Sequence, residues 1–278
     1  MDSDPISDTL NSAPEANAVL SHGPAQLGKP LLRPAQVAVW WLGAQGRKPQ
    51  DWQALESLLS ETEKTRAARF HFERDRHSFI LAHALCRGLL TYCTGQSVHS
   101  HAFDTGDHGK PEVIVPVGAP RLRINISHTH GMAAAALTLD CDIGLDVEAT
   151  TRDVDALKLA EHMFAPRECT VLARAPAARL TETFLAFWTL KEAYVKAIGK
   201  GLSQPLQAFS FDLATCAIWF DDTLADTPET WRFERLRPGP EHIMALGVRH
   251  PDPASLSIDA RPAPVDYLLS LGDAILRR

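Results

Sequence analysis

The chain has 278 residues, of which 45% are hydrophobic and 22% charged, and its formal net charge at pH 7 is −6. This composition is typical of a globular protein with one large or two small domains and a sizeable buried core. The negative charge argues against a protein that coats nucleic acid or an anionic membrane, so any anion-binding site must be local.

The cysteines and the hydrophobic runs favour a reduced, cytoplasmic protein. The five cysteines are widely spaced and form no CxxC pair, which predicts neither a disulfide framework nor a cysteine zinc site. The most apolar run, residues 131–139, is about half the length that a membrane-spanning helix needs, and the N-terminus lacks the basic segment of an export signal. We therefore expect no membrane span and no export.

The first part of the chain predicts a tail followed by helices. Residues 1–30 are rich in Ser, Ala, Pro and Asp without periodicity, and we expect a poorly ordered tail. A strand is expected over residues 36–42, a short helix over 51–59 and one or two helices over 61–92.

A small sheet is expected next. Before its strands come three neighbouring histidines, His99, His101 and His108, which could be zinc ligands. Their polar, glycine-containing context instead favours a solvated loop. The expected strands cover residues 111–117, 122–127, 132–139 and 143–148.

The second part of the chain, residues 143–278, again places helices before strands. It predicts a helix broken at Pro166 and a long helix over 178–199, with Gly199 suited to a left-handed C-terminal position. The expected strands cover residues 209–213, 217–220, 231–236 and 243–250. We therefore predict an α+β fold of two similar halves in one chain, residues 31–142 and 143–278, each with helices packed on a small antiparallel sheet.

Two carboxylates share one face of the strand expected at residues 143–148. Strand alternation places Asp146 and Glu148 on the same side, with their Cα atoms about 6.7 Å apart, which is two strand rises. Neighbouring carboxylates repel each other, and a hard cation such as Mg²⁺, which prefers oxygen ligands, would relieve that repulsion. For this fragment alone, the solvated face of an edge strand is the simpler interpretation.

A third carboxylate lies in the long helix. Glu192 shares a helix face with Trp188 and with Lys196, at i, i+4 spacing, and Lys191 precedes it. The simpler alternative is a surface pair between Glu192 and Lys196 that contributes about 0.3–0.5 kcal/mol. However, the crowding of aromatic and aliphatic residues leaves little of this helix solvated, which favours a functional charge cluster.

Candidate contacts for an anion lie elsewhere in the chain. Lys110 stands before a proline, and Ser127 and His128 end a strand shortly before a glycine, where backbone and imidazole groups could meet phosphate oxygens. A lone His128 would more often be structural. Five basic residues cluster near the start of the expected helices: Lys64, Arg66, Arg69, Arg74 and Arg76. Acidic residues lie between and beside them, and such a cluster is most often a solvated helix face.

Taken in order, four motifs resemble those of the 4'-phosphopantetheinyl transferase superfamily, specifically its surfactin-type members with two fused halves. The motifs are GKP at residues 109–111, NISHTHG at 125–131, IGLDVE at 143–148 and FWTLKEAYVKAIGKGL at 187–202. The last motif fits the family pattern W-x-x-K-E-[AS]-x-x-K-x-x-G-x-G-[LF], and GLDVE fits G-[IVL]-D-[IVL]-E. The resemblance covers roughly residues 55–250.

The resemblance implies a reaction. Members of this family transfer the phosphopantetheine arm of coenzyme A to a serine of an acyl or peptidyl carrier protein, with Mg²⁺ on the pyrophosphate, and release adenosine 3',5'-bisphosphate. The carriers serve fatty acid, polyketide or non-ribosomal peptide synthesis. Two halves in one chain imply an active site in the cleft between them and a monomer. The negative net charge and the short apolar runs favour neither a nucleic acid nor a membrane partner.

The resemblance also implies roles for individual residues. Asp146, Glu148 and Glu192 would be metal ligands, with Glu192 or a metal-bound water as the base for the serine hydroxyl. Lys191 and Lys196 would contact the pyrophosphate and offset the charge that develops on the leaving group.

The implied coenzyme A contacts lie mainly in the first half. They are Lys110, Ser127, His128 and Arg66, and His128 would also belong to the catalytic set. The family also has a lysine upstream of the position that Arg66 occupies. This chain has Glu63 there, and Lys64 or Arg69 could supply the missing positive charge.

Two other functions compete with this one. A non-catalytic module of the same fold could dock carrier proteins, although binding alone gives no chemical need for converging carboxylates. The other alternative is a different Mg²⁺-dependent phosphate enzyme, such as a nucleotide hydrolase. It is less well supported, because the chain has neither of the nucleotide-binding motifs GxxxxGK[ST] and GxGxxG.

Overall fold

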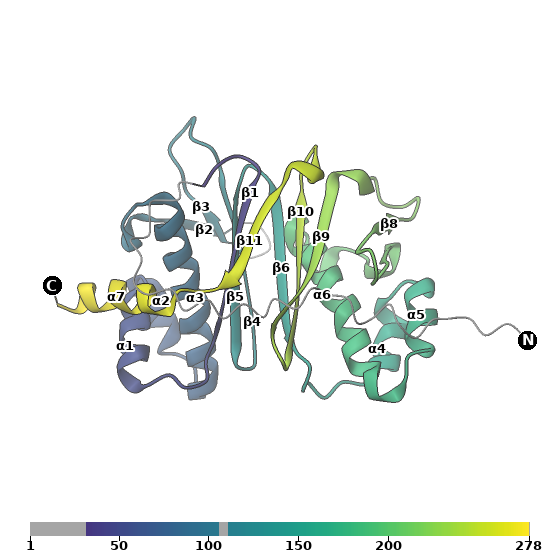
Figure 1. The fold of residues 1–278 in the computed structure, drawn as a ribbon, viewed down its shortest axis with the longest axis horizontal. Coiled ribbons are helices and arrows are strands. Elements are labelled where there is room, and N and C mark those ends of the chain that lie inside the picture. The colour runs from purple at the N-terminus through teal and green to yellow at the C-terminus, as the bar shows by residue number, and fades with distance from the viewer. Residues whose placement is uncertain (1–31, 106–110, 278) are drawn as a thin grey trace, which may run out of the picture.

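Two β-sheets lie between two groups of helices in this computed structural model (Figure 1). The structure describes residues 32–105 and 111–277. The tail expected at residues 1–30 lies outside the described residues, as do His108 and Lys110.

The first sheet has the strand order β11-β1-β5-β4. Its strands are β1 (Gln36–Gly43), β4 (Leu122–Thr129), β5 (Met132–Leu139) and β11 (Ser257–Pro262), of which β11 runs parallel to β1. The short strands of a neighbouring hairpin are β2 (Phe103–Thr105) and β3 (Pro111–Val113). The α-helices of this half are α1 (Pro49–Ser57), α2 (Glu61–Ala67), α3 (Glu73–Thr94) and α7 (Val265–Leu276).

The second sheet is antiparallel and has the strand order β6-β10-β9. Its strands are β6 (Asp142–Ala149), β9 (Trp231–Gly239) and β10 (His242–Arg249). A second short hairpin pairs β7 (Phe209–Phe211) with β8 (Ile218–Phe220). The α-helices of this half are α4 (Ala156–Met163), α5 (Pro166–Ala173) and α6 (Leu180–Ile198).

The two halves repeat one topology. Each begins with a strand, continues with helices and a short hairpin, and ends with two strands, the last of which pairs with the first: β5 with β1, and β10 with β6. The predicted α+β fold of two similar halves is therefore confirmed.

The hydrophobic core follows the layers. α3 covers one face of the first sheet, α6 covers one face of the second, and a third apolar cluster fills the space between the two sheets. β5 contributes to two of these clusters, because Ala133 and Ala135 pack in the α3 cluster whereas Ala134 and Ala136 pack between the sheets. Small side chains on a strand that is buried on both faces let both neighbouring layers approach closely.

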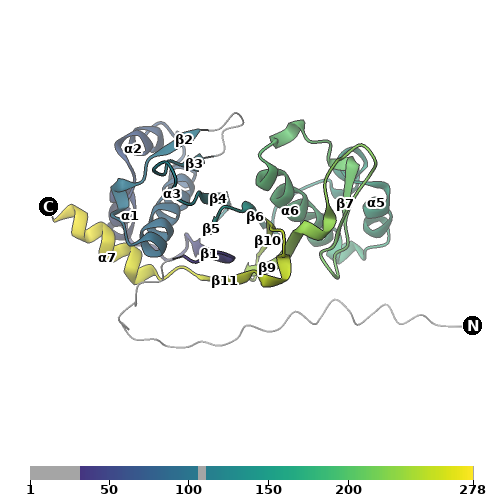
Figure 2. The same ribbon diagram turned by 90° about the horizontal axis from the view of Figure 1, so that it is seen from above.

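The end of the chain returns to the first half, which corrects the predicted boundary. Residues 143–278 are expected from the sequence to form one half, yet β11 pairs with β1, and α7 packs against α1 (Figures 1 and 2). Trp40 in β1 contacts Tyr267 in α7, with ring centroids 6.3 Å apart. The strand pattern of β11 is weak in the sequence, because Ile258 and Ala260 are its only apolar residues before the final proline.

Several local predictions can also be compared with the structure. Gly199 ends α6 with a left-handed φ of 70°, and the helical region around Pro166 is divided into α4 and α5, both as predicted. All five cysteines are free thiols, as predicted. The prediction of a solvated loop is wrong for His101. Its side chain is buried, with the residue only 5% exposed, and its Nε2 lies 3.3 Å from the Thr94 hydroxyl. Within the described ranges, none of the helices is long and apolar enough to cross a membrane.

Candidate functional site

The candidate site lies where α6 rests directly on β6. A Cβ atom at Gly144 would fall 1.9 Å from the carbonyl oxygen of Ala193, so a residue without a side chain is required for this close approach. The next positions on the same strand face are Asp146 and Glu148, which therefore lie beside the helix turn that carries Glu192. The predicted alternation of this strand is confirmed, because Ile143, Leu145 and Val147 pack in the cluster between the sheets.

The three carboxylates are electrostatic neighbours. Burial raises the pKa of Glu192, the charges of Asp146 and Glu148 raise it further, and Lys196 acts in the opposite direction. The pKa of Glu148 is likewise raised, first by burial and then by Asp146. Across the described part of the chain, no hydrogen bond ends on the Glu192 carboxylate. Glu192 therefore keeps its oxygens available.

Asp146 is held through one oxygen only. Lys196 Nζ lies 2.6 Å from Asp146 Oδ1, and Ser127 Oγ donates to the same oxygen at 3.0 Å. The Lys196 ammonium also donates to Ser127 Oγ at 3.1 Å and to the Leu145 carbonyl at 3.2 Å. The second oxygen, Asp146 Oδ2, is buried without a hydrogen-bond partner among the described residues. A buried carboxylate oxygen without a partner is costly, and a cation would satisfy it.

A seam of side-chain hydrogen bonds joins β4 to β6. Side-chain oxygens of alternate β4 residues accept hydrogen bonds from alternate β6 backbone N–H groups, at 2.8, 3.2 and 3.3 Å: Asn125 from Leu145, Ser127 from Val147 and Thr129 from Ala149. In this seam, the side chains of one edge strand take the place of the carbonyl groups that a paired strand would offer. The seam fixes the register between the two sheets and holds Ser127 beside Asp146.

Glu148 is engaged by both of its oxygens. Arg152 NH1 lies 2.7 Å from Oε1, and Thr129 Oγ1 donates to Oε2 at 3.3 Å. The Glu148 side chain is only 13% exposed, whereas that of Arg152 is 46% exposed. An ion pair with such an exposed arginine is weak and can give way to a cation.

The donor set suits Mg²⁺ in its chemistry but is not closed around an ion. Asp146 Oδ2 and Glu192 offer uncommitted carboxylate oxygens, which are the ligands that Mg²⁺ prefers. In this conformation, however, the described residues contain no group of three His, Cys, Asp or Glu side chains placed to hold a metal ion. Lys196 supplies a positive charge to Asp146 instead. The structure thus brings the three predicted ligands together as neighbours, not as a coordination shell.

His128 lies at the end of β4 and is exposed. Partial loss of hydration lowers its pKa, and the charges of Lys196 and His83 lower it further. This shift favours the neutral imidazole, which offers one donor and one acceptor. His128 therefore lies close enough to Lys196 to feel its charge.

The predicted contact of Lys191 with a pyrophosphate is wrong in this structure. The Lys191 side chain is 0% exposed, and its ammonium donates at 2.7 Å to the carbonyls of Leu206 and Phe209 and lies 2.8 Å from Glu168 Oε2. These three acceptors use all three ammonium protons. Glu168 is also fully enclosed and accepts from two backbone N–H groups. Lys191 therefore ties α6 to α5 and β7 inside the second half.

The basic residues of α2 are divided between the surface and the interior. Arg66 is exposed and stacks over the Phe79 ring at 5.4 Å, without a carboxylate partner in the described ranges. Glu63 points inward, where Arg87 Nε lies 2.6 Å from Oε2 and His83 Nδ1 lies 3.0 Å from Oε1. Glu63 is thus part of a partly buried network that joins α2 to α3, which explains an acidic residue at this position.

Sequence reasoning missed several residues of the site and its support. They are Asn125, Thr129, Arg152 and Glu168. Asn125 and Thr129 lie two positions on either side of Ser127, so strand alternation alone could have placed them on the same face. No comparable signal in the sequence marks Arg152 or Glu168.

Two family models match the chain. One describes the 4'-phosphopantetheinyl transferase superfamily and matches residues 142–247, and the other describes the N-terminal part of a 4'-phosphopantetheinyl transferase and matches residues 47–138. The two matches fall on the second and first halves of the fold.

Curated proteins give the same result. The 4'-phosphopantetheinyl transferase HetI of Nostoc sp. is 33% identical over 152 residues, which cover 55% of this chain and 64% of HetI. The 4'-phosphopantetheinyl transferase Sfp of Bacillus subtilis is 28% identical over 196 residues, covering 70% of this chain and 84% of Sfp. The transferase ffp of Bacillus subtilis is 30% identical over 159 residues, covering 57% of this chain and 68% of ffp. The match to HetI spans less than two thirds of that relative.

Proposed function

This chain belongs to the 4'-phosphopantetheinyl transferase superfamily, and on that basis we propose that it transfers the phosphopantetheine arm of coenzyme A to a serine of an apo acyl or peptidyl carrier protein. The reaction would depend on Mg²⁺ and release adenosine 3',5'-bisphosphate. The carriers would belong to fatty acid, polyketide or non-ribosomal peptide synthesis. The observation that supports this proposal most directly is the electrostatic proximity of Asp146, Glu148 and Glu192 to one another and to Lys196, where α6 rests on β6.

Asp146, Glu148 and Glu192 would hold the metal ion. When bound, Mg²⁺ would neutralise charge on the pyrophosphate and stabilise the leaving bisphosphate. Ser127 would act by orienting Asp146, because its hydroxyl already donates to Asp146 and accepts from Val147 N–H and from Lys196.

Glu192 is the best candidate for the base. No hydrogen bond from the described residues ends on its carboxylate, so an oxygen that does not hold the metal ion can accept the proton of the carrier serine. The serine oxygen would form a bond to the phosphorus next to the pantetheine arm, and the bond from that phosphorus to the bridging oxygen would break. The proton would pass to Glu192, and the bond electrons would leave with the bisphosphate.

Lys196 and His128 would contact the phosphates. The Lys196 ammonium can offset charge that develops on the leaving oxygens, and a neutral His128 can donate one hydrogen bond. Arg66 and Lys110 are proposed to contact coenzyme A as well, Arg66 because it is exposed and has no carboxylate partner in the described ranges. We also propose a monomer, since both halves that would form the cleft lie in one chain.

The test is an intact-mass assay. The purified chain is incubated with coenzyme A, Mg²⁺ and a panel of apo carrier proteins, with the Glu192→Gln variant as the matched control. We expect one phosphopantetheine per carrier, lost in the variant and in the presence of a chelator. Coenzyme A binding without transfer to any carrier would favour a docking module, and transfer by Glu192→Gln at a near-normal rate would contradict the role of Glu192.

A further inference from the structure

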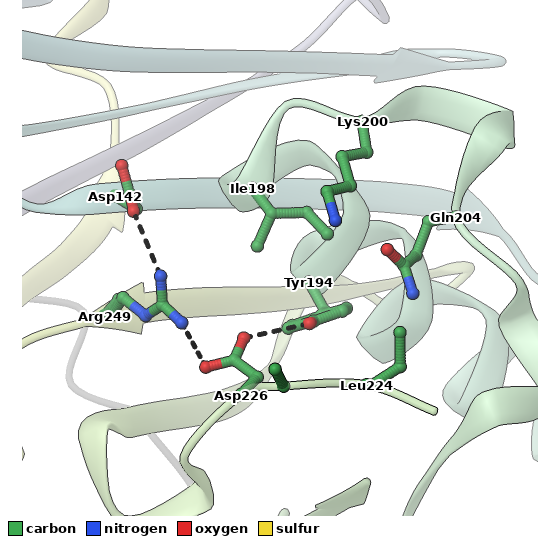
Figure 3. A pocket seen from close by; sticks show the side chains of 9 residues that line it. Asp142, Tyr194, Ile198, Lys200, Gln204, Leu224, Asp226 and Arg249 are labelled. Carbon is green, nitrogen blue, oxygen red and sulfur yellow. Dashed lines mark hydrogen bonds and ion pairs between the residues drawn. The ribbon is translucent and has the colours of Figure 1, made fainter. Parts of the chain in front are cut away.

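A cavity lies on the other side of α6 from the carboxylates. It has a volume of about 230 Å³, and Tyr194, Ile198 and Gln204 line it together with residues of β6, β10 and the segment before β9 (Figure 3). Tyr194 and Ile198 are each two residues beyond Glu192 and Lys196, which is about 200° around the helix. The cavity is therefore separate from the candidate active site.

Most charges in this cavity are already paired. Arg249 bonds with Asp226, and Asp142 is bound by Arg123 at 2.8 Å. Asp226 also accepts a hydrogen bond from the Tyr194 hydroxyl at 2.9 Å. The Arg249 guanidinium lies over the Trp231 ring at 5.1 Å, which further fixes its position. The carboxylates of the lining are thus committed to cations of the protein.

Two donors at one end of the cavity remain uncommitted. Gln204 is only 3% exposed, yet its Nε2 has no hydrogen-bond partner among the described residues. The Lys200 ammonium makes no ion pair within the described ranges and points toward the cavity from above Gln204 (Figure 3). An unpartnered amide in such a buried position costs free energy that a bound acceptor would recover. Figure 3 shows Asp142 at the left of the view, apart from Lys200 and Gln204.

We propose that this cavity binds a small monocarboxylate. Its carboxylate accepts from Lys200 and Gln204, and its short apolar chain lies against Ile198 and Leu224. One negative charge is the match, because Arg249 pairs with Asp226 and lies 3.8 Å from Asp142, so that Lys200 has no carboxylate partner among the described residues that line the cavity. A dianionic phosphate would meet the nearby carboxylates without a second free cation. A cavity of about 230 Å³ is roomy enough for an acid of a few carbons.

Methyl NMR of the full chain tests this proposal with butyrate as the probe. The isotope-labelled methyl groups of Ile198 and Leu224 report from the cavity walls, and chloride keeps the ionic strength constant. Butyramide is the neutral control of the same shape. We expect saturable shifts of these two residues with butyrate and none with butyramide. The assay contains no coenzyme A, so its result is independent of the proposed transferase reaction.

Variants identify the donors. Lys200→Met is expected to weaken butyrate binding by about tenfold, as is Gln204→Leu, while Lys158→Met, which removes an exposed lysine of α4, leaves it unchanged. The dispersed methyl spectrum of each variant shows that it is folded. Equal binding of butyramide, shifts that never saturate, or unchanged affinity in Lys200→Met would each overturn the proposal.

Discussion

The ammonium of Lys196 lies 2.6 Å from Asp146 Oδ1, while the other oxygen of the same carboxylate is buried without a partner in the described chain. Lys196 comes from α6 and Asp146 from β6, so this contact joins the two elements that carry the carboxylates. In this conformation a lysine supplies the positive charge that the proposed Mg²⁺ would bring. Lys196 and the metal ion are therefore expected to compete electrostatically.

The first prediction concerns that competition. Lys196→Met should bind Mg²⁺ about tenfold more tightly, or roughly 1.4 kcal/mol, because it removes a positive charge next to the metal ligands. The same variant should lose most of its transfer activity, because the leaving phosphate loses a cation. Isothermal titration calorimetry measures the first effect, with Lys158→Met as the control. Unchanged or weaker Mg²⁺ binding would show that Lys196 is not in competition with a metal.

The second prediction separates the two lysines of the KEAYVK motif. Lys191→Met should lower the free energy of unfolding by about 3–5 kcal/mol, because it leaves Glu168 buried without its cation. The measurement is urea unfolding, again compared with Lys158→Met. If Lys191→Met kept its full stability and lost only affinity for coenzyme A, the result would contradict a structural role and support direct contact of Lys191 with the pyrophosphate.

The third prediction tests the contact between α6 and β6. Gly144→Ala would place a Cβ atom 1.9 Å from Ala193 O and 2.5 Å from Ala197 N, both backbone atoms of the helix. The helix must shift, so we expect a loss of stability of about 1–3 kcal/mol or more, together with weaker Mg²⁺ binding. Gly43→Ala is the control, since its Cβ would meet nothing closer than 3.9 Å. Equal unfolding curves for the two variants would contradict this packing.

The fourth prediction is a pH dependence. Burial opposes the ionisation of Glu63, but hydrogen bonds from His83, Arg87 and the backbone of Ser60 outweigh it and lower the pKa of Glu63 from 4.5 to about 2. A lowered carboxyl pKa stabilises the fold above the unfolded pKa, and this stabilisation is lost as the pH falls toward the folded pKa. Over the whole window it amounts to about 3 kcal/mol.

Glu63→Gln removes this titration. The stability difference between wild type and variant should therefore be about 1 kcal/mol smaller at pH 4 than at pH 7. Urea unfolding at both pH values measures it. A difference that stays constant with pH would mean that Glu63 is not ionised by this network.

Strand and helix periodicity predicted the parts of the site that lie within single elements. Asp146 and Glu148 share a strand face, and Gly199 ends α6, because both features depend on local geometry alone. The return of β11 to the first sheet could not be predicted in this way, since a parallel pairing with β1 is a long-range contact and β11 has little hydrophobic alternation.

Burial explains the errors in residue roles. Lys191 and Lys196 look equivalent in the sequence, but only the packing of α5 and β7 around α6 shows that Lys191 is enclosed with Glu168. Likewise, Glu63 reads as a break in a basic cluster until its contacts with Arg87 are known. Ion pairs between distant segments leave no periodic signal in a sequence.

Measuring both products of one reaction tests the proposed phosphopantetheine transfer most directly. Carrier mass and adenosine 3',5'-bisphosphate are followed together, with coenzyme A and Mg²⁺, for the wild type and for Glu192→Gln. We predict one bisphosphate for each phosphopantetheine added to the carrier, and neither product with the variant. Bisphosphate released without any gain in carrier mass would indicate hydrolysis of coenzyme A, and would contradict the proposed transfer.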